Sequence, residues 1–394
     1  MSLKVALSTW SKFHFFHLAR EMERAGVLSQ VFMNLPRWRV GDEGVPAAKI
    51  EANVFPAIMR YGLMRYAIAL PRPLDRGLTR WVDSSQQRFV ARRLGEADAL
   101  VALSGAGLGG GRAIQRRGGV FVCERASTHI SWVERELSEE YRRFGLPPLR
   151  IDPWLVEKEL AEYAESDAVV VPSRFVRRTF VEHGVPASKI TVNPYGVSLA
   201  TFGRDQVVRD DDEFRVAFVG QISLRKGVPY LLEAFRRVRH PKKRLTLIGV
   251  VQRDMAGLMD RFPLDGVEFA GRATRAEIRR ALNRSDAFCI ASIEEGMAVV
   301  SGEALACGLP VVATENSGAG EIVSDGVEGF VTPARDAAVL ADRLQNLADD
   351  PALRARMSAA ALAKAGSLGG WGQYGDRYLD LLSRLTGKGL EPGV

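Results

Sequence analysis

The chain has 394 residues, of which 46% are hydrophobic and 26% charged, and its formal net charge is +7. This length predicts two domains, and the apolar fraction suffices for sizeable cores. The sequence contains no apolar run long enough for a membrane-spanning helix. The first residues lack the features of a signal peptide and are expected to form a strand. The basic residues belong to no nucleic-acid-binding motif, so no nucleic-acid partner is expected.

Short apolar segments alternate with helical segments along the chain, which is typical of parallel sheets covered by helices on both faces. In the first half the predicted strands are residues 3–8, 27–34, 99–103, 120–123, 168–171 and 191–193. The polar run Arg209-Asp-Asp-Asp-Glu213 is expected to end a linker. In the second half the predicted strands are residues 214–219, 244–249, 267–270, 286–291 and 310–314. We therefore predict an α/β protein with two Rossmann-like domains that face a central cleft.

The three cysteines, Cys123, Cys289 and Cys307, each lie in an apolar setting. Three thiols cannot all pair with one another, and none has the spacing of metal ligands. We expect them to be reduced and buried, as in a cytosolic protein.

A glycine-rich segment, Gly105-Ala-Gly-Leu-Gly-Gly110, matches the G-x-G-x-x-G pattern of dinucleotide-binding turns. Glu124 follows 19 residues after Gly105, where such proteins place an acid that binds a ribose hydroxyl. Only seven residues separate Gly110 from Gly118, too few for a normal crossover helix. We therefore expect a flexible loop at the cleft, and an NAD-dependent oxidoreductase is kept as an alternative.

Two carboxylates mark the candidate site, in the stretch Glu295-Gly-Met-Ala-Val-Val-Ser-Gly-Glu303. The stretch lies between two predicted strands and contains the start of a helix. Ligands of open α/β sheets bind at the carboxyl ends of the strands, so Glu295 is expected to face the site. The backbone N–H groups after Gly296 would open the helix and form a seat for an anion. Glu303 would lie about two turns into that helix.

This stretch resembles a motif of glycosyltransferase family 4, the retaining nucleotide-sugar transferases of the GT-B fold. Other segments that resemble the family are Asp167–Ser173, Pro194–Val197, Phe218–Gly227 and Glu315–Phe330. The likeness is good over about residues 155–385 and weak over residues 1–150. It implies an acceptor-side domain at residues 1–205 and a donor-binding domain at residues 206–370. It also implies a final helix, residues 371–386, that crosses back to the first domain.

The resemblance also implies roles for single residues. Lys226 would stabilise the leaving diphosphate, Arg225 would supply the charge of a family arginine that is Gln221 here, and Glu295 would hold the sugar. Many family members carry a histidine in this region, near the reacting sugar, to which His129 corresponds loosely. A catalytic role is therefore expected for His129, and a polar surface role stays open. The implied donor-binding residues are Gly220, Gln221, Gly296, Met297, Ala298, Val299 and Glu303. Met297 and Ala298 replace an aromatic residue and a glycine of the family.

The implied activity is retaining transfer of a sugar from a UDP- or GDP-sugar to a saccharide or lipid-linked acceptor, in cell-surface polysaccharide or glycolipid biosynthesis. No cofactor and no essential metal are expected. A GT-B sugar-nucleotide epimerase and a degenerate binding protein are further alternatives. The D-x-D pattern Asp210–Asp212 lies in the linker and is not expected to bind a metal. His14 and His17 are expected to pack against the sheet for want of a third ligand.

Residues 55–94 contain eight arginines against two aspartates, interleaved with aromatic and aliphatic residues. Such a segment can lie on an anionic membrane, where each cation contributes about 1 kcal/mol. Many members of the family act at the inner face of the plasma membrane, so the resemblance favours a cytoplasmic, peripheral location. The alternative is a helix that covers the sheet with its apolar stripe and exposes its arginines to solvent.

Overall fold

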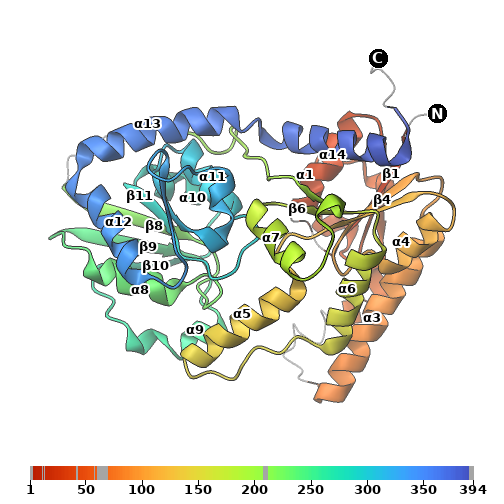
Figure 1. Ribbon diagram of the computed structural model, residues 1–394, viewed down its shortest axis with the longest axis horizontal. Coiled ribbons are helices and arrows are strands. Elements are labelled where there is room, and N and C mark those ends of the chain that lie inside the picture. The colour runs from red at the N-terminus through yellow and green to blue at the C-terminus, as the bar shows by residue number, and fades with distance from the viewer. Residues whose placement is uncertain are drawn as a thin grey trace.

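The protein consists of two domains, each built on a parallel β-sheet, as the computed structural model shows (Figure 1). The structure describes residues 3–389 except 11, 13, 41, 42, 57, 60–69 and 207–211. The strand order is β3-β2-β1-β4-β5-β6-β7 in the first sheet and β10-β9-β8-β11-β12-β13 in the second. In both sheets the strand order reverses direction beside the first strand, which places a crevice at the carboxyl ends of the strands. The predicted α/β fold with two Rossmann-like domains is confirmed.

The strands lie close to their predicted positions. Those of the first sheet are β1 (Val5–Ser8), β2 (Leu28–Met33), β3 (Ile50–Ala52), β4 (Ala99–Leu103), β5 (Val120–Glu124), β6 (Ala168–Val171) and β7 (Ile190–Val192). Those of the second are β8 (Phe214–Val219), β9 (Lys243–Ile248), β10 (Val267–Gly271), β11 (Ala287–Ile290), β12 (Val311–Thr314) and β13 (Gly329–Thr332). The sequence did not predict β3 and β13, which are short strands at sheet edges. The central strands β1, β4, β5, β6, β11 and β12 are almost wholly buried because helices cover both of their faces.

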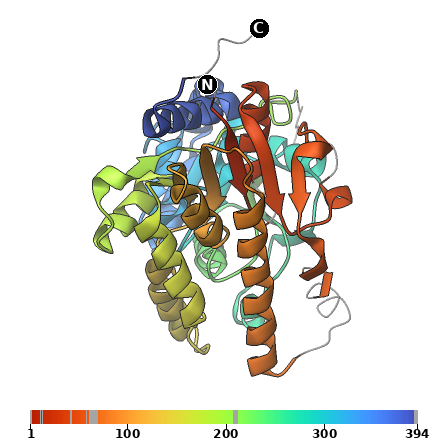
Figure 2. The same cartoon turned by 90° about the vertical axis from the view of Figure 1, so that its right-hand side faces the viewer.

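Helices connect successive strands and cover the sheets. The first domain contains α1 (Phe15–Arg24), α3 (Arg72–Arg93), α4 (Leu108–Gln115), α5 (Ile130–Arg143), α6 (Pro153–Glu165) and α7 (Arg174–Glu182). The second contains α8 (Val228–Arg237), α9 (Arg253–Ala256), α10 (Arg275–Asn283), α11 (Val299–Ala306), α12 (Ala337–Asp349) and α13 (Pro351–Ser367), and α14 (Gly370–Thr386) ends the chain. Figure 2 shows the long helix α3 running down one side of the first domain.

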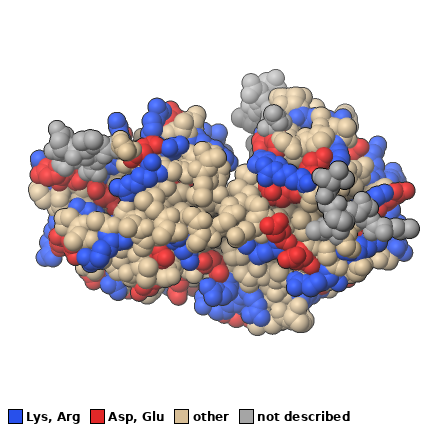
Figure 3. Space-filling view, turned by 90° about the horizontal axis from the view of Figure 1, so that it is seen from above, with Lys and Arg blue, Asp and Glu red and all other residues tan. Residues whose placement is uncertain are grey.

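Two helices join the domains. The last helix, α14, packs against α1 of the first domain (Figures 1 and 2). From α14 the Tyr374 hydroxyl also donates to the carboxylate of Glu124, at the end of β5, at 2.9 Å. Helix α5 of the first domain reaches the second, where Arg335 forms ion pairs with Glu140 at 2.7 Å and with Glu136 at 3.0 Å. The two lobes meet at an indentation in Figure 3, and on that face Lys and Arg are mixed with Asp and Glu rather than gathered in one patch.

Two expectations about composition can be compared with the structure. Cys123, Cys289 and Cys307 are all buried and form no disulfide. Within the described part of the chain, no helix is both long and apolar enough to span a membrane.

Candidate active site

Two loops at the carboxyl edge of the second sheet bring the predicted cations and carboxylate together. The Arg225 carbonyl, in the loop after β8, accepts hydrogen bonds from the N–H groups of Ile293 at 2.9 Å and Glu294 at 3.4 Å, in the loop after β11. Gly227 has φ +64°, and a Cβ atom there would lie 1.8 Å from the Ala291 carbonyl oxygen. Only glycine tolerates both conditions, so Gly227 lets the loops touch.

The touching loops place Lys226, Arg225 and Glu295 in one cluster. The Lys226 ammonium forms an ion pair with the Glu295 carboxylate. Arg225 Nη2 lies 3.6 Å from an oxygen of the same carboxylate. Burial and the neighbouring Arg225 lower the pKa of Lys226 to about 7, although Glu294 opposes the shift. Two cations at the carboxyl edge of a sheet could receive the charge of a leaving diphosphate.

Glu303 lies in the second turn of α11, as the sequence predicted, although the helix begins at Val299. Burial raises the pKa of Glu303 to about 7, while Arg275 on the neighbouring helix α10 acts in the opposite direction. No group among the described residues donates a hydrogen bond to this carboxylate. It can therefore accept hydrogen bonds from the hydroxyl groups of a ligand.

The other predicted donor-binding residues differ in exposure. Gly220 is half-buried and Gln221 is exposed, both in the loop after β8. Val299, the first residue of α11, is half-buried, whereas the side chains of Met297 and Ala298 are buried.

The predicted anion seat after Gly296 is partly occupied by contacts within the protein. The Ala298 N–H donates to the Ser317 carbonyl at 3.1 Å. The Gly296 carbonyl accepts from the Ser173 hydroxyl of the first domain at 2.7 Å. A Cβ atom on Gly296 would lie 1.9 Å from the Ala126 carbonyl oxygen. This glycine therefore allows the two domains to approach each other closely.

Glu294 is a candidate functional residue that sequence reasoning missed. It is wholly buried, and one carboxylate oxygen accepts hydrogen bonds from the Ser127 hydroxyl at 2.6 Å and from the Thr128 N–H and hydroxyl at 3.0 and 2.8 Å. The other oxygen accepts from Arg225 Nε at 2.6 Å. Burial alone would raise the pKa of Glu294, but Arg225 and these hydrogen bonds outweigh it and lower the pKa to about 2.

Through these hydrogen bonds Glu294 connects the first domain to the loop that carries the candidate cations. The only sequence signal for it is a second acid beside Glu295 at the end of a buried strand.

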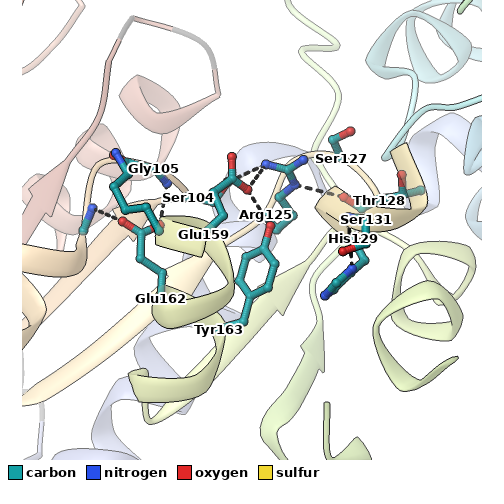
Figure 4. A network of polar contacts seen from close by, with 12 residues as sticks. Ser104, Gly105, Arg125, Ser127, Thr128, His129, Ser131, Glu159, Glu162 and Tyr163 are labelled. Carbon is teal, nitrogen blue, oxygen red and sulfur yellow. Dashed lines mark hydrogen bonds and ion pairs between the residues drawn. The ribbon is translucent and has the colours of Figure 1, made fainter. Parts of the chain in front are cut away.

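His129 lies at the N-terminus of α5, where its ring nitrogen accepts a hydrogen bond from the Ser131 N–H at 3.3 Å (Figure 4). The ring is stacked on His183 with the centroids 4.4 Å apart, and it also packs against Tyr163 and Phe180. Burial and His183 lower the pKa of His129 to about 3. This environment favours a structural role, and the catalytic role stays a prediction.

The glycine-rich turn at residues 105–110 is filled by a carboxylate of the protein itself. Glu162 accepts hydrogen bonds from the N–H groups of Gly105 at 2.5 Å and of Gly107 and Leu108 at 2.9 Å (Figure 4). The segment enters helix α4, so the expectations of a flexible loop and of no crossover helix were wrong.

The second element of the dinucleotide alternative is also engaged within the protein. Glu124 accepts hydrogen bonds from the hydroxyl groups of Tyr374 and Tyr378 and contacts the ring of His14. Both the turn and the acid that NAD would need are therefore occupied, which does not favour the oxidoreductase alternative.

The remaining candidate metal ligands have other contacts. His14 binds Glu124, and the His17 ring is stacked on Trp371 with the centroids 3.9 Å apart, which agrees with packing roles. Asp210 and Asp211 lie outside the described residues, and Asp212 pairs with Lys242 at 2.6 Å. Across the described ranges, no group of three or more His, Cys, Asp or Glu could hold a metal ion.

Comparisons with known proteins agree with this architecture. The family model described as Glycosyltransferase Family 4 matches residues 12–201, and the model described as Glycosyl transferases group 1 matches residues 201–364. The putative colanic acid biosynthesis glycosyltransferase WcaL of Escherichia coli (strain K12) is 31% identical over 172 residues, which are 41% of this chain and 42% of that protein. The glycogen synthase of Mycobacterium tuberculosis (strain ATCC 25618 / H37Rv) is 30% identical over 244 residues, 60% of this chain and 55% of that protein. The chain therefore spans about half the length of these curated relatives.

Solved structures resemble the protein over almost its whole length. Anabaena Alr3699/HepE in complex with UDP and glucose has a TM-score of 0.71 at 18% identity, covering 97% of this chain and 100% of that chain. Sucrose-phosphate synthase (tll1590) from Thermosynechococcus elongatus has a TM-score of 0.74 at 18% identity, covering 98% and 100%. At these identities the likeness concerns the fold alone. Since the two family models together match residues 12–364 and the two-sheet architecture agrees with them, the chain belongs to glycosyltransferase family 4 and has the GT-B fold.

Proposed function

We propose that the protein transfers a sugar from a UDP- or GDP-sugar to a saccharide or lipid-linked acceptor, with retention of configuration at the anomeric carbon. The observation that carries the proposal is the cluster of Lys226, Arg225 and Glu295 at the carboxyl edge of the second sheet, close to the N-terminus of α11. A UDP complex of Alr3699/HepE, which shares the fold, supports a nucleotide-sugar donor. The relative WcaL, named for colanic acid biosynthesis, supports a role in cell-surface polysaccharide synthesis.

In this proposal each group of the site has a separate task. Glu303 accepts hydrogen bonds from the ribose hydroxyls, because its carboxylate lies in the second turn of α11 without a donor among the described residues. Lys226 leaves its ion pair with Glu295 to bind the diphosphate, and Arg225 adds a second positive charge. These cations and the N-terminus of α11 stabilise the negative charge that develops on the leaving group, so no essential metal or cofactor is invoked. Glu295 is then available to hold hydroxyl groups of the transferred sugar.

Binding of nucleotides to the whole protein tests the donor site. Calorimetric titrations with UDP, GDP, ADP and NAD should show binding of UDP or GDP, and Glu303→Ala should weaken it by about 1.5–3 kcal/mol, the contribution of a hydrogen bond to a charged group. Lys226→Ala should weaken it further and reduce turnover. Glu182→Ala, which removes an exposed glutamate of the first domain, is the control and should change nothing. Unchanged UDP and GDP affinity in both site variants, with the fold intact, would refute the assignment.

The products separate the enzyme classes. A transferase should form a new glycosidic bond whose anomeric configuration, read from proton coupling constants, is that of the donor. An epimerase would alter the sugar nucleotide without any acceptor, and a degenerate binding protein would not even hydrolyse the donor slowly.

We also propose a cytoplasmic location with peripheral attachment to an anionic membrane through residues 55–94. In this segment Phe55, Ile58 and Leu74 are 71%, 57% and 61% exposed, which supports an apolar contact with lipid. Residues 60–69, with two of the eight arginines, lie outside the described residues. Arg76 and Arg80 pair with Asp152, so these two cations are not counted toward lipid binding.

A further inference from the structure

The guanidinium group of Arg225 is held along one edge only. Its Nε–H donates to the Glu294 carboxylate at 2.6 Å, whereas neither Nη atom donates a hydrogen bond to any residue that the structure describes. Arg225 Nη2 lies 3.6 Å from Glu295, which makes an ion pair beyond hydrogen-bond distance. The N–H groups on the outer edge of the guanidinium are therefore open to the oxygens of a ligand, and the side chain is 33% exposed.

The first domain in turn orients the carboxylate of Glu294. One of its oxygens accepts hydrogen bonds from the Ser127 hydroxyl and from the N–H and hydroxyl of Thr128, and the other oxygen faces Arg225. Glu294 is wholly buried, so water does not replace these donors. Three donors on one oxygen fix the direction in which the other oxygen points, and with it the Nε edge of Arg225.

Arg125 fixes the loop that carries Ser127 and Thr128 (Figure 4). Its Nε donates to the Thr128 carbonyl at 3.0 Å, and its Nη1 donates to the Ser104 hydroxyl at 3.0 Å. The same guanidinium forms an ion pair with Glu159 of α6. Because the donors of arginine form a rigid planar fork, these contacts hold the loop in one conformation.

The orientation of Arg225 matters because a second acid lies close to it. If Glu294 turned away, the nearest partner for the guanidinium would be Glu295, already 3.6 Å from Nη2. A full ion pair with Glu295 would occupy the Nη groups and neutralise the cation that would otherwise bind a diphosphate. The contact with Glu294 keeps the Nη edge of Arg225 out of such a pair.

The members of this network belong to different domains. Residues 125–128 lie between β5 and α5 of the first domain, whereas Arg225 and Glu294 follow β8 and β11 of the second. The present orientation of Arg225 therefore depends on contact between the domains at this point. First-domain residues thus influence a cation of the donor site without reaching the donor themselves.

We infer that Ser127 and Thr128, fixed by Arg125, are positioning residues that hold Glu294 so that the Nη edge of Arg225 faces the leaving diphosphate. This inference rests on the proposed function, in which Arg225 binds the diphosphate, and adds first-domain residues to that task. They act through Glu294 and touch no part of the donor. Their loss should weaken binding of the β-phosphate and leave binding of the nucleoside monophosphate part unchanged.

The affinity that the β-phosphate adds tests the inference. Calorimetry on the whole protein gives the ratio of the Kd for UMP to the Kd for UDP, or of GMP to GDP if guanine nucleotides bind. Arg225→Ala should lower this ratio about tenfold or more, as expected when a charge-assisted hydrogen bond is lost.

The decisive variant combines Ser127→Ala with Thr128→Val. It leaves the Thr128 N–H as the one first-domain donor to Glu294 among the described residues. It should lower the ratio about fivefold, the effect of losing neutral hydrogen bonds, while the affinity for the monophosphate changes by less than about twofold. Ser131→Ala is the matched control, because it removes a hydroxyl group from the start of α5 that is not among the donors to Glu294, and it should change neither affinity.

Two further variants separate positioning from a general loss of stability. In the Arg225→Ala background the Ser127→Ala and Thr128→Val pair should lower the ratio no further, because the cation that it positions is absent. Arg125→Lys keeps the charge beside Glu159 but not the planar fork, and it should lower the ratio in the unmodified background.

Four results would overturn the inference while nucleotides still bind. These are an unchanged ratio in the Ser127→Ala and Thr128→Val variant, an unchanged ratio in Arg125→Lys, an equal loss of monophosphate and diphosphate affinity, and additive effects in the Arg225→Ala background. If none of the four nucleotides binds the unmodified protein, the proposed function is overturned as well.

Discussion

Replacement of Glu294 by glutamine should loosen the contact between the domains. The variant keeps the shape of the side chain and an oxygen that can accept from Ser127 and Thr128. It removes the negative charge and, with that oxygen toward Ser127 and Thr128, turns the amide N–H₂ group toward the Arg225 guanidinium. Arg225 would then lose its close partner and keep only Glu295, whose carboxylate oxygen is 3.6 Å away.

The size of the effect follows from four hydrogen bonds to one buried carboxylate. Hydrogen bonds to a charged group contribute about 1.5–3 kcal/mol each and neutral ones about 0.5–1.5. Removing one partner of a buried ion pair costs about 3–5 kcal/mol. Arg225 is one-third exposed and can recover some hydration, so we expect a loss near 3 kcal/mol in the free energy of unfolding.

Denaturant unfolding measures this loss, and small-angle scattering measures the separation of the domains. Glu321→Gln is the matched control, because Glu321 also crosses the interface, to the Arg174 N–H at 2.6 Å, but the Arg174 side chain is 75% exposed. It should cost less than about 1 kcal/mol. A double-mutant cycle of Glu294→Gln with Ser127→Ala should show coupling of about 1 kcal/mol.

The effect should also depend on pH with a defined sign. The pKa of Glu294 is lowered from 4.5 to about 2, so its stabilisation is present above about pH 4.5 and is lost as the pH falls toward 2. The stability difference between the unmodified protein and Glu294→Gln should therefore shrink over that interval. Two results would refute this role of Glu294: a loss of less than 1 kcal/mol in the free energy of unfolding at neutral pH, or a stability difference between the two proteins that does not shrink in acid.

Three further predictions concern the site and the surface. Nucleotide affinity should be highest near pH 7, because the Glu303 carboxylate forms only as the pH rises through about 7 and the Lys226 ammonium is lost above that pH. In calorimetric titrations over a range of pH, Glu303→Gln should remove the fall in affinity on the acid side, and Lys226→Arg should remove the fall on the alkaline side. Sugar transfer should survive excess EDTA, and complete loss that Mg²⁺ or Mn²⁺ restores would instead implicate Asp210 and Asp212. The protein should float with vesicles that contain anionic lipid and be released from them by salt. The double substitution Phe55→Asp and Ile58→Asp should abolish flotation. If the unmodified protein does not float with these vesicles at low salt, residues 55–94 do not bind the membrane.

The sequence by itself determined the architecture, because buried parallel strands are short apolar runs and each is followed by a helical segment. It missed the edge strands β3 and β13, of three and four residues, although it predicted the equally short edge strand β7. Local spacing also predicted that Lys226 and Glu295 lie at strand ends, where the fold brings them into contact.

Only the tertiary structure decided which neighbour each polar group has. Glu294 and Glu295 are adjacent in the sequence, but one binds Thr128, 166 residues away, and the other binds Lys226. The glycine-rich turn had the pattern of a phosphate site, and Glu162 fills it. Periodicity reports which face of an element is buried, whereas the partner of a buried charge depends on contacts between distant segments, which local pattern does not encode.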